Sequence, residues 1–303
     1  MATIPTPAPK TPPGPAPKTP PGPAPKTAAG PAGGRARRAG PALAVAALLA
    51  FSLFPVYWMV SSAFDPGAGT RGASVLPSGF TLDHFRYVLD TGDFTTFLAN
   101  SALVGAGTVL LSGLLSLFAA VAVARFRFRM RTKVLVMILI VQMVPLEALV
   151  IPLFLQMSDL GMLNSLLGLT VVYLAFSLPF GIWTLRGFVA AVPREIEEAA
   201  YLDGCGWWRM FRSVLLPLVA PGLVATSIFA FIVAWNEFIF AFTFMQDDSK
   251  YTAAVGLHRF FGQYSTDWGA VMAGSTLITV PVLIFFVVVQ RRLAGGLAAG
   301  AIK

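Results

Sequence analysis

Six long apolar runs constrain this chain more than any other feature of its sequence. They span residues 42–63, 97–124, 134–157, 166–185, 218–244 and 269–290. Each run is long enough for the roughly 20 residues with which a helix crosses a bilayer. The rest of the composition agrees, because 56% of the residues are hydrophobic and only 12% are charged. We therefore expect an all-α protein with six transmembrane helices, located in the cell membrane with lipid as part of its solvent.

The distribution of Lys and Arg predicts the orientation, because basic residues close to a span resist translocation. Eighteen of the 22 fall in the tail before residue 42, in the loops at 125–133 and 186–217, and at the C-terminal end. The run from Arg125 to Lys133 is interpreted as an anchor at the anionic inner leaflet rather than a nucleic-acid groove. The N terminus, the C terminus and the loop at 186–217 are predicted to be cytoplasmic.

The first 40 residues have a different composition. The sequence PAPKTPPG occurs at 7–14 and 15–22 and is followed by PAPKTAAG at 23–30, without apolar residues that could form a core. We expect a disordered cytoplasmic tail over residues 1–40 and a membrane domain over residues 41–303. The tail is read as a basic tether, with a Pro-rich ligand for another domain as the alternative. The first apolar run is too long for the core of a secretory signal.

The sequence lacks the residue sets on which catalysis and metal binding depend. Cys205 is the only cysteine, and the only histidines, His84 and His258, fall in two separate outer loops. A zinc site needs three or four such ligands close together. No Gly-rich loop ending in Gly-Lys-Ser or Gly-Lys-Thr is present, so this chain does not bind ATP in the usual way. We expect no enzyme activity, no metal and no cofactor.

The loop between the fourth and fifth runs carries the strongest local signals. Pro193 suits the first turn of a helix, and Glu195, Glu197 and Glu198 suit its N-terminal end. Gly204 suits the left-handed residue that ends a helix. A short helix over about 193–203 is therefore predicted to lie across the membrane face. One side of it carries Ile196, Ala199, Ala200 and Asp203, and the two alanines leave room for another surface.

The residues after Gly206 predict an amphipathic segment. Trp207, Trp208, Met210 and Phe211 alternate with arginines and should lie in the lipid interface. Pro217 and Pro221 are then expected to turn the chain into the fifth span. On local physics alone, an ordinary interfacial loop explains these signals equally well.

The full spacing of this loop resembles a known family. It reads Glu-Ala-Ala, three residues, Gly204, nine residues and then Val-Leu-Leu-Pro ending at Pro217. This pattern resembles the loop by which ABC importer permeases contact their ATPases, here residues 187–217. The resemblance extends from about residue 42 to the C terminus, with a type I core at about 95–290, and is strongest to the carbohydrate permeases of the maltose-transporter class. It includes GMLNSLLGLTVVYLAFSLPFGIWTLRGF at 161–188, AWNEF at 234–238 and GGLAAGAIK at 295–303. Two departures are Val214, where the family usually has Ile, and the Pro-rich tail.

The resemblance implies a permease subunit that forms half of the path for a monosaccharide or oligosaccharide. Its partners would be an ABC ATPase homodimer that binds the ATP, a second permease and an extracytoplasmic solute-binding protein, with no nucleic acid. Glu198 would accept a hydrogen bond from the ATPase, Ala199 and Ala200 would form the contact face, and Gly204 would permit the turn. Asp203 and Pro217 complete the coupling set, and the segment at 295–303 would reach between the ATPase subunits.

Alternatives concern the solute and the transport class. A permease for another small solute, such as a polyamine or glycerol phosphate, fits the same loop. A secondary transporter would show inverted repeats or a chain of buried charges, and neither is found. An intramembrane enzyme would need buried Ser/His, Asp/Asp or His/Glu sets, which are absent.

Acidic residues within the apolar runs are candidates for a substrate path, since charges in a membrane are costly. Glu147 lies near Pro145 in the third run, and Asn236 and Glu237 lie in the outer third of the fifth. Each could bind substrate hydroxyls. The alternative is structural, with the carboxylate satisfied by backbone or water near a helix break.

Overall fold

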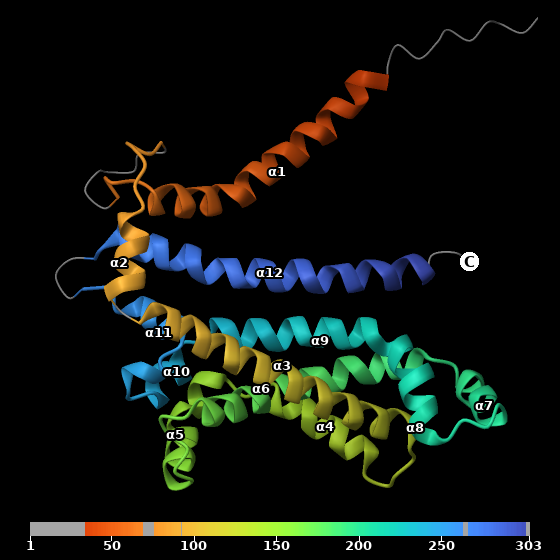
Figure 1. Ribbon diagram of the computed structural model, residues 1–303. Helices are drawn as coiled ribbons and strands as arrows, with labels where there is room; N and C mark the ends of the chain where they lie inside the picture. The colour runs from red at the N-terminus through yellow and green to blue at the C-terminus, as the bar shows by residue number, and fades with distance from the viewer. Residues whose placement is uncertain (1–33, 69–75, 92, 263–265, 301–303) are drawn as a thin grey trace, which may run out of the picture. The chain divides into compact units, whose positions relative to one another are not determined.

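The computed structural model describes residues 34–68, 76–91, 93–262 and 266–300, and these residues are helical apart from their connecting segments (Figure 1). The only β-type pairing among them is an isolated bridge between Phe261 and Thr266. The prediction of an all-α protein is confirmed. The tail predicted over 1–40 lies outside the described residues up to residue 33, while residues 34–40 already belong to the first helix.

Within the described residues, five helical stretches are long and apolar enough to cross a membrane. They are α1 (Gly34–Ala63), α3 (Phe94–Arg125), α6 (Leu166–Ala191), α12 (Trp268–Gly300), and the continuous stretch of α8 (Trp207–Met210), η2 (Phe211–Leu215) and α9 (Leu216–Asn236). The shorter elements are α2 (Asp83–Thr91), α7 (Arg194–Leu202), α10 (Ile239–Phe244), η3 (Asp248–Lys250) and α11 (Ala253–His258).

The third predicted run is a broken span. It consists of α4 (Arg131–Val141), η1 (Leu146–Leu149) and α5 (Val150–Asp159), with a bend of 94° between the two parts. Pro145 precedes η1 and has an extended conformation. Because proline has no backbone N–H, no helical hydrogen bond from this residue is lost at the break. Pro152 lies in the first turn of α5, a position at which helices tolerate proline. With the bent pair counted as one span, the part of the chain that the structure describes has the six predicted crossings, by length and composition.

The fifth run is predicted over 218–244, whereas the helix observed there covers Trp207–Asn236 and so begins and ends earlier. Pro217 and Pro221 do not turn the chain: the helix runs from Trp207 through both prolines to Asn236. The π-helical turn η2 ends at Leu215, two residues before Pro217, and such a widened turn makes room for the proline ring. At the other end Glu237 is extended, and α10 starts as a separate helix.

Internal contacts divide the chain into two units, at residue 52. In the first unit, the side chains described, from residue 41 to 52, are all exposed, as suits a helix in contact with lipid. In the second unit, α3, α6 and α9 pack side by side (Figure 1). Small residues permit the close approach: Gly181 of α6 faces Ser112 and Ser116 of α3, and Gly113 of α3 faces Leu223 of α9.

The contact of α3 with α6 should fail when Gly181 is enlarged. A Cβ atom at Gly181 would lie 2.9 Å from Cβ of Ser116, so Gly181→Val must push the helices apart. Overpacking of this kind costs about 1–3 kcal/mol. We expect a lower apparent unfolding temperature for the detergent-purified protein, measured by tryptophan fluorescence. Gly187→Val is the matched control, because a Cβ at Gly187 in the same helix meets nothing within 4 Å. Equal unfolding temperatures for the two variants would contradict this packing.

Candidate functional site

The loop between α6 and α9 contains the predicted short helix, α7. It covers Arg194–Leu202, against a prediction of about 193–203. Pro193 is the cap residue before the helix rather than part of its first turn. Glu195 and Glu197 stand in the first turn, where carboxylates interact favourably with the helix dipole.

The C-terminal end of α7 is a Schellman motif. Gly204 has φ of +80°, the left-handed conformation predicted for it. The N–H of Cys205 donates to the carbonyl of Ala200 at 3.0 Å, and the N–H of Gly204 donates to that of Tyr201 at 3.0 Å. A Cβ at Gly204 would meet nothing within 4 Å, so backbone conformation alone favours glycine here.

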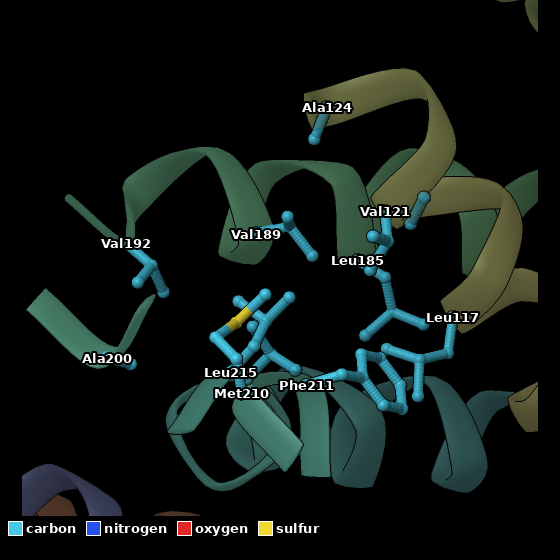
Figure 2. Close-up of a cluster of buried hydrophobic side chains, with 12 residues drawn as sticks. Leu117, Val121, Ala124, Leu185, Val189, Val192, Ala200, Met210, Phe211 and Leu215 are labelled. Atoms are coloured by element: carbon cyan, nitrogen blue, oxygen red, sulfur yellow. The ribbon is translucent and has the colours of Figure 1, made fainter. Parts of the chain in front are cut away.

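The inner face of α7 packs on a buried apolar cluster at the end of the bundle (Figure 2). Ala200 is 8% exposed and contributes to this cluster. The other members come from α3, from the end of α6, and from the stretch around η2. They are Leu117, Ala120, Val121, Ala124, Leu185, Val189, Val192, Met210, Phe211, Leu215 and Val219. The two alanines therefore do not share one outward face: Ala200 points into its own protein and Ala199 is exposed.

The outer face of α7 carries most of the predicted coupling residues. Glu198, Ala199, Asp203 and Gly204 are exposed. Between them Leu202 is 89% exposed, the highest value among the large exposed apolar side chains. An exposed leucine beside two carboxylates suits a surface that a partner covers. Pro217 is exposed in the first turn of α9 and is not part of the cluster below α7.

A buried ion pair fixes the first turn of α7 to the end of α3. Nη2 of Arg125 lies 2.6 Å from Oε1 of Glu197, and the two side chains are only 11% and 12% exposed. The same Nη2 donates to the carbonyl of Val192, just after α6, at 2.9 Å. In return, Nη2 of Arg194 donates to the carbonyl of Arg125 at 3.2 Å. Sequence reasoning missed this pair and read Arg125 as a membrane anchor, which its burial contradicts.

The aromatic residues after Gly206 form one stack. Trp207 and Trp208 lie 5.4 and 5.5 Å from the ring of Phe211, which also stacks on Phe118 of α3 at 5.5 Å. Met210 and Phe211 are buried, while the two tryptophans are about half exposed. The segment is therefore the first turns of the helix that continues into α9, packed on α3, and not a separate segment before it. Its place in the lipid interface stays a prediction.

The candidate path residues lie apart from one another. Glu147 is exposed in η1, at the bend of the broken span. Glu237 lies in the break between α9 and α10, where its carboxylate accepts three hydrogen bonds: from the hydroxyl of Tyr173 at 2.5 Å, and from the N–H groups of Phe240 at 2.9 Å and Ala241 at 3.1 Å. The amide of Asn236 donates to the carbonyl of Ile232 in its own helix at 3.1 Å. These contacts favour the structural account of Glu237.

A cavity of about 290 Å³ lies beside the bend, between α4, η1, α6 and α9. Its lining includes one polar side chain, Gln142, and a stacked pair, Phe180 and Phe229, with ring centres 3.9 Å apart. The rest of the lining is apolar: Val141, Val144, Leu146, Ala175, Phe176, Pro179 and Val233. Glu147, Asn236 and Glu237 are not among the lining residues, so sequence reasoning selected polar residues near the two helix breaks and missed the cavity itself.

A family model and two curated relatives all point to membrane components of transport systems. Residues 112–298 match the family described as the binding-protein-dependent transport system inner membrane component. The chain is 41% identical over 268 residues to the diacetylchitobiose uptake system permease protein DasC of Streptomyces coelicolor, covering 88% of this chain and 97% of that protein. It is 34% identical over 258 residues to the trehalose transport system permease protein SugB of Mycobacterium tuberculosis, covering 84% and 94%.

A solved structure has the same fold. A chain of a bacterial ABC transporter involved in the import of the acidic polysaccharide alginate matches with a TM-score of 0.72 at 23% identity, over 85% of this chain and 96% of that chain.

Replacing Glu237 separates its structural role from a role in binding. Glu237→Ala leaves the N–H groups of Phe240 and Ala241 and the buried hydroxyl of Tyr173 without their acceptor. Buried donors left unpaired cost about 1–3 kcal/mol. We expect a clear fall in the apparent unfolding temperature in detergent. Asn236→Ala, which loses one bond at an exposed site, should leave it nearly unchanged. An unaltered unfolding temperature for Glu237→Ala would mean that the carboxylate is not a structural cap.

Proposed function

Since this chain belongs to the family of inner membrane components of binding-protein-dependent transport systems, we propose that it is the permease half of an ATP-driven sugar importer whose partner ATPase contacts α7. One observation carries the proposal. The short helix is fastened to the bundle on one face, by Ala200 and the Arg125–Glu197 pair, and is bare on the other. Such a helix can transmit the displacement of a partner into the membrane domain.

The exposed residues of α7 have distinct roles in this proposal. Glu198 accepts a charge-assisted hydrogen bond from the ATPase, and Ala199 allows close approach. Asp203 and Leu202 extend the contact surface toward Gly204. Ala200 acts from the inside, by holding the helix on its cluster. ATP is bound by the partner, because this chain has no phosphate-binding loop of its own.

The cavity beside the broken span supports a role as half of a translocation path. A second permease would supply the other half. An extracytoplasmic binding protein would deliver the solute, in agreement with the family's description as binding-protein-dependent. Phe180 and Phe229 offer flat apolar faces of the kind on which sugar rings stack, and Gln142 offers hydrogen bonds. The related uptake systems for diacetylchitobiose and trehalose support a sugar as the solute. The alternative to a sugar is another small solute, such as a polyamine or glycerol phosphate.

Purification of the complex tests the coupling role. Gly204→Val forces a β-branched residue into a left-handed conformation and should distort the end of α7, whereas Gly206→Val places the same side chain at φ of −70°. We expect an ATPase to co-purify stoichiometrically with the wild-type chain and with Gly206→Val. Gly204→Val should lose sugar uptake in proteoliposomes by an order of magnitude or more, through loss of about 1.4 kcal/mol or more of coupling. Normal uptake by Gly204→Val would remove α7 from the coupling pathway.

The positions of the basic residues support an orientation with both termini and α7 in the cytoplasm. Thiol labelling tests it. Leu202→Cys in a Cys205→Ser background places a single thiol at the most exposed position of α7. We expect a membrane-impermeant maleimide to label it in inside-out vesicles and not in intact cells. Labelling in intact cells would reverse the orientation and with it the proposed ATPase contact.

A further inference from the structure

The C-terminal ends of α3 and α6 meet the first turn of α7. The end of α3 supplies Arg125, the residue just after α6 supplies the carbonyl of Val192, and α7 supplies Glu197 and Arg194. The guanidinium of Arg125 bonds to both Val192 and Glu197, while Arg194 bonds back to the carbonyl of Arg125. Polar contacts therefore run in both directions between α3 and α7.

The connections of α7 to its neighbours are of different kinds. To α6 it is joined by the chain itself, through Val192 and Pro193 alone. To α8 it is joined by the short segment from Asp203 to Gly206. No such covalent link joins α7 to α3, whose last residue lies 69 positions before the start of α7. The direct contacts between α7 and α3 are therefore non-covalent, and the other route between them is the packing of α3 against α6 and the stretch around η2.

The ion pair is the polar link best suited to carry that displacement. Its two side chains are nearly nine-tenths buried, so water screens their attraction much less than it screens a surface pair. Both charges also have favourable positions, since Arg125 is at the C-terminal end of α3 and Glu197 is near the N-terminal end of α7. The hydrogen bond from Arg194 to the carbonyl of Arg125 is exposed to solvent, and the contact of Ala200 with the apolar cluster is non-directional.

We propose that Arg125 is a positioning residue that makes α3 follow α7, so that movement imposed on α7 by the ATPase is divided between α6 and α3. This inference rests on the proposed function and adds to it the route into the bundle. Because α3 packs along both α6 and α9, a link to α3 moves the helices that flank the cavity as one group. Without the link, movement of α7 would reach α3 only indirectly, through α6 and the stretch around η2.

The test measures the number of sugar molecules taken up per ATP hydrolysed. The complete complex is reconstituted in proteoliposomes with whichever of diacetylchitobiose and trehalose the wild type transports. Arg125→Met and Glu197→Gln should each lower this ratio by at least about fivefold while the ATPase still co-purifies. A merely structural role would lower the yield of the complex and leave the ratio unchanged in the complexes that assemble.

Matched controls come from the same two segments. Arg127→Met changes an exposed residue two positions from Arg125. Glu195→Gln changes a residue in the same helical turn as Glu197. Both should keep the wild-type ratio. Arg125→Lys retains the charge but offers one ammonium in place of a planar fork, so we expect a ratio between those of Arg125→Met and the wild type.

The charge-swapped double variant, Arg125→Glu with Glu197→Arg, completes the experiment. It should recover part of the ratio lost in the single variants, and only part, because both charges then oppose the helix dipoles. Wild-type ratios for Glu197→Gln and Arg125→Lys would overturn the inference while leaving the proposed function intact. A wild-type chain that retains no ATPase and moves neither sugar would overturn both.

Discussion

The hydrocarbon core of a membrane offers no water, so every backbone N–H and C=O group of a spanning segment needs a hydrogen-bond partner within the protein. This constraint governs where the chain departs from straight helices. Its three departures inside the membrane runs each have a local remedy. At Pro145 the chain forms a new short helix, η1, directly after the break. At Pro217 a π-helical turn precedes the ring. At Glu237 a carboxylate accepts the N–H groups that open α10. The breaks therefore occur where the sequence supplies a proline or an acceptor.

The same constraint explains where acidic side chains stand. Glu237 is stabilised by two backbone N–H groups and a tyrosine hydroxyl, so its presence in an apolar run has a structural cause. Glu197 is stabilised by Arg125 at the end of the bundle. Glu198, one residue later, is exposed and has its charge available for a partner. Adjacent glutamates thus differ in role because a helix turns by about 100° between them.

Much of the fold could be predicted from the sequence, because apolar runs of bilayer length and proline positions are local signals. The span count, the short helix at 194–202 and the left-handed Gly204 are such cases. The face of α7 that packs inward was not predictable, since Ala199 and Ala200 are equally small. Nor was the partner of Arg125, which lies 72 positions away at Glu197 and becomes its neighbour only when α3 and α6 pack together. In the sequence, Arg125 is one of five alternating basic residues, and nothing local distinguishes it from Arg127.

The position of the ion pair also bears on how stiff the loop is. A Schellman motif closes the C-terminal end of α7 through main-chain bonds within its own cap, next to the short connection to α8, and the Arg125–Glu197 pair fixes the N-terminal end to α3. A nine-residue helix is too short to be stable in isolation, so these end contacts and the packing of Ala200 keep it helical. A helix held at both ends moves as a rigid unit, and the elements attached to its ends must move with it. The geometry therefore favours transmission of force through α7 over local unfolding of the loop, and it assigns the two ends of α7 to different helices of the bundle.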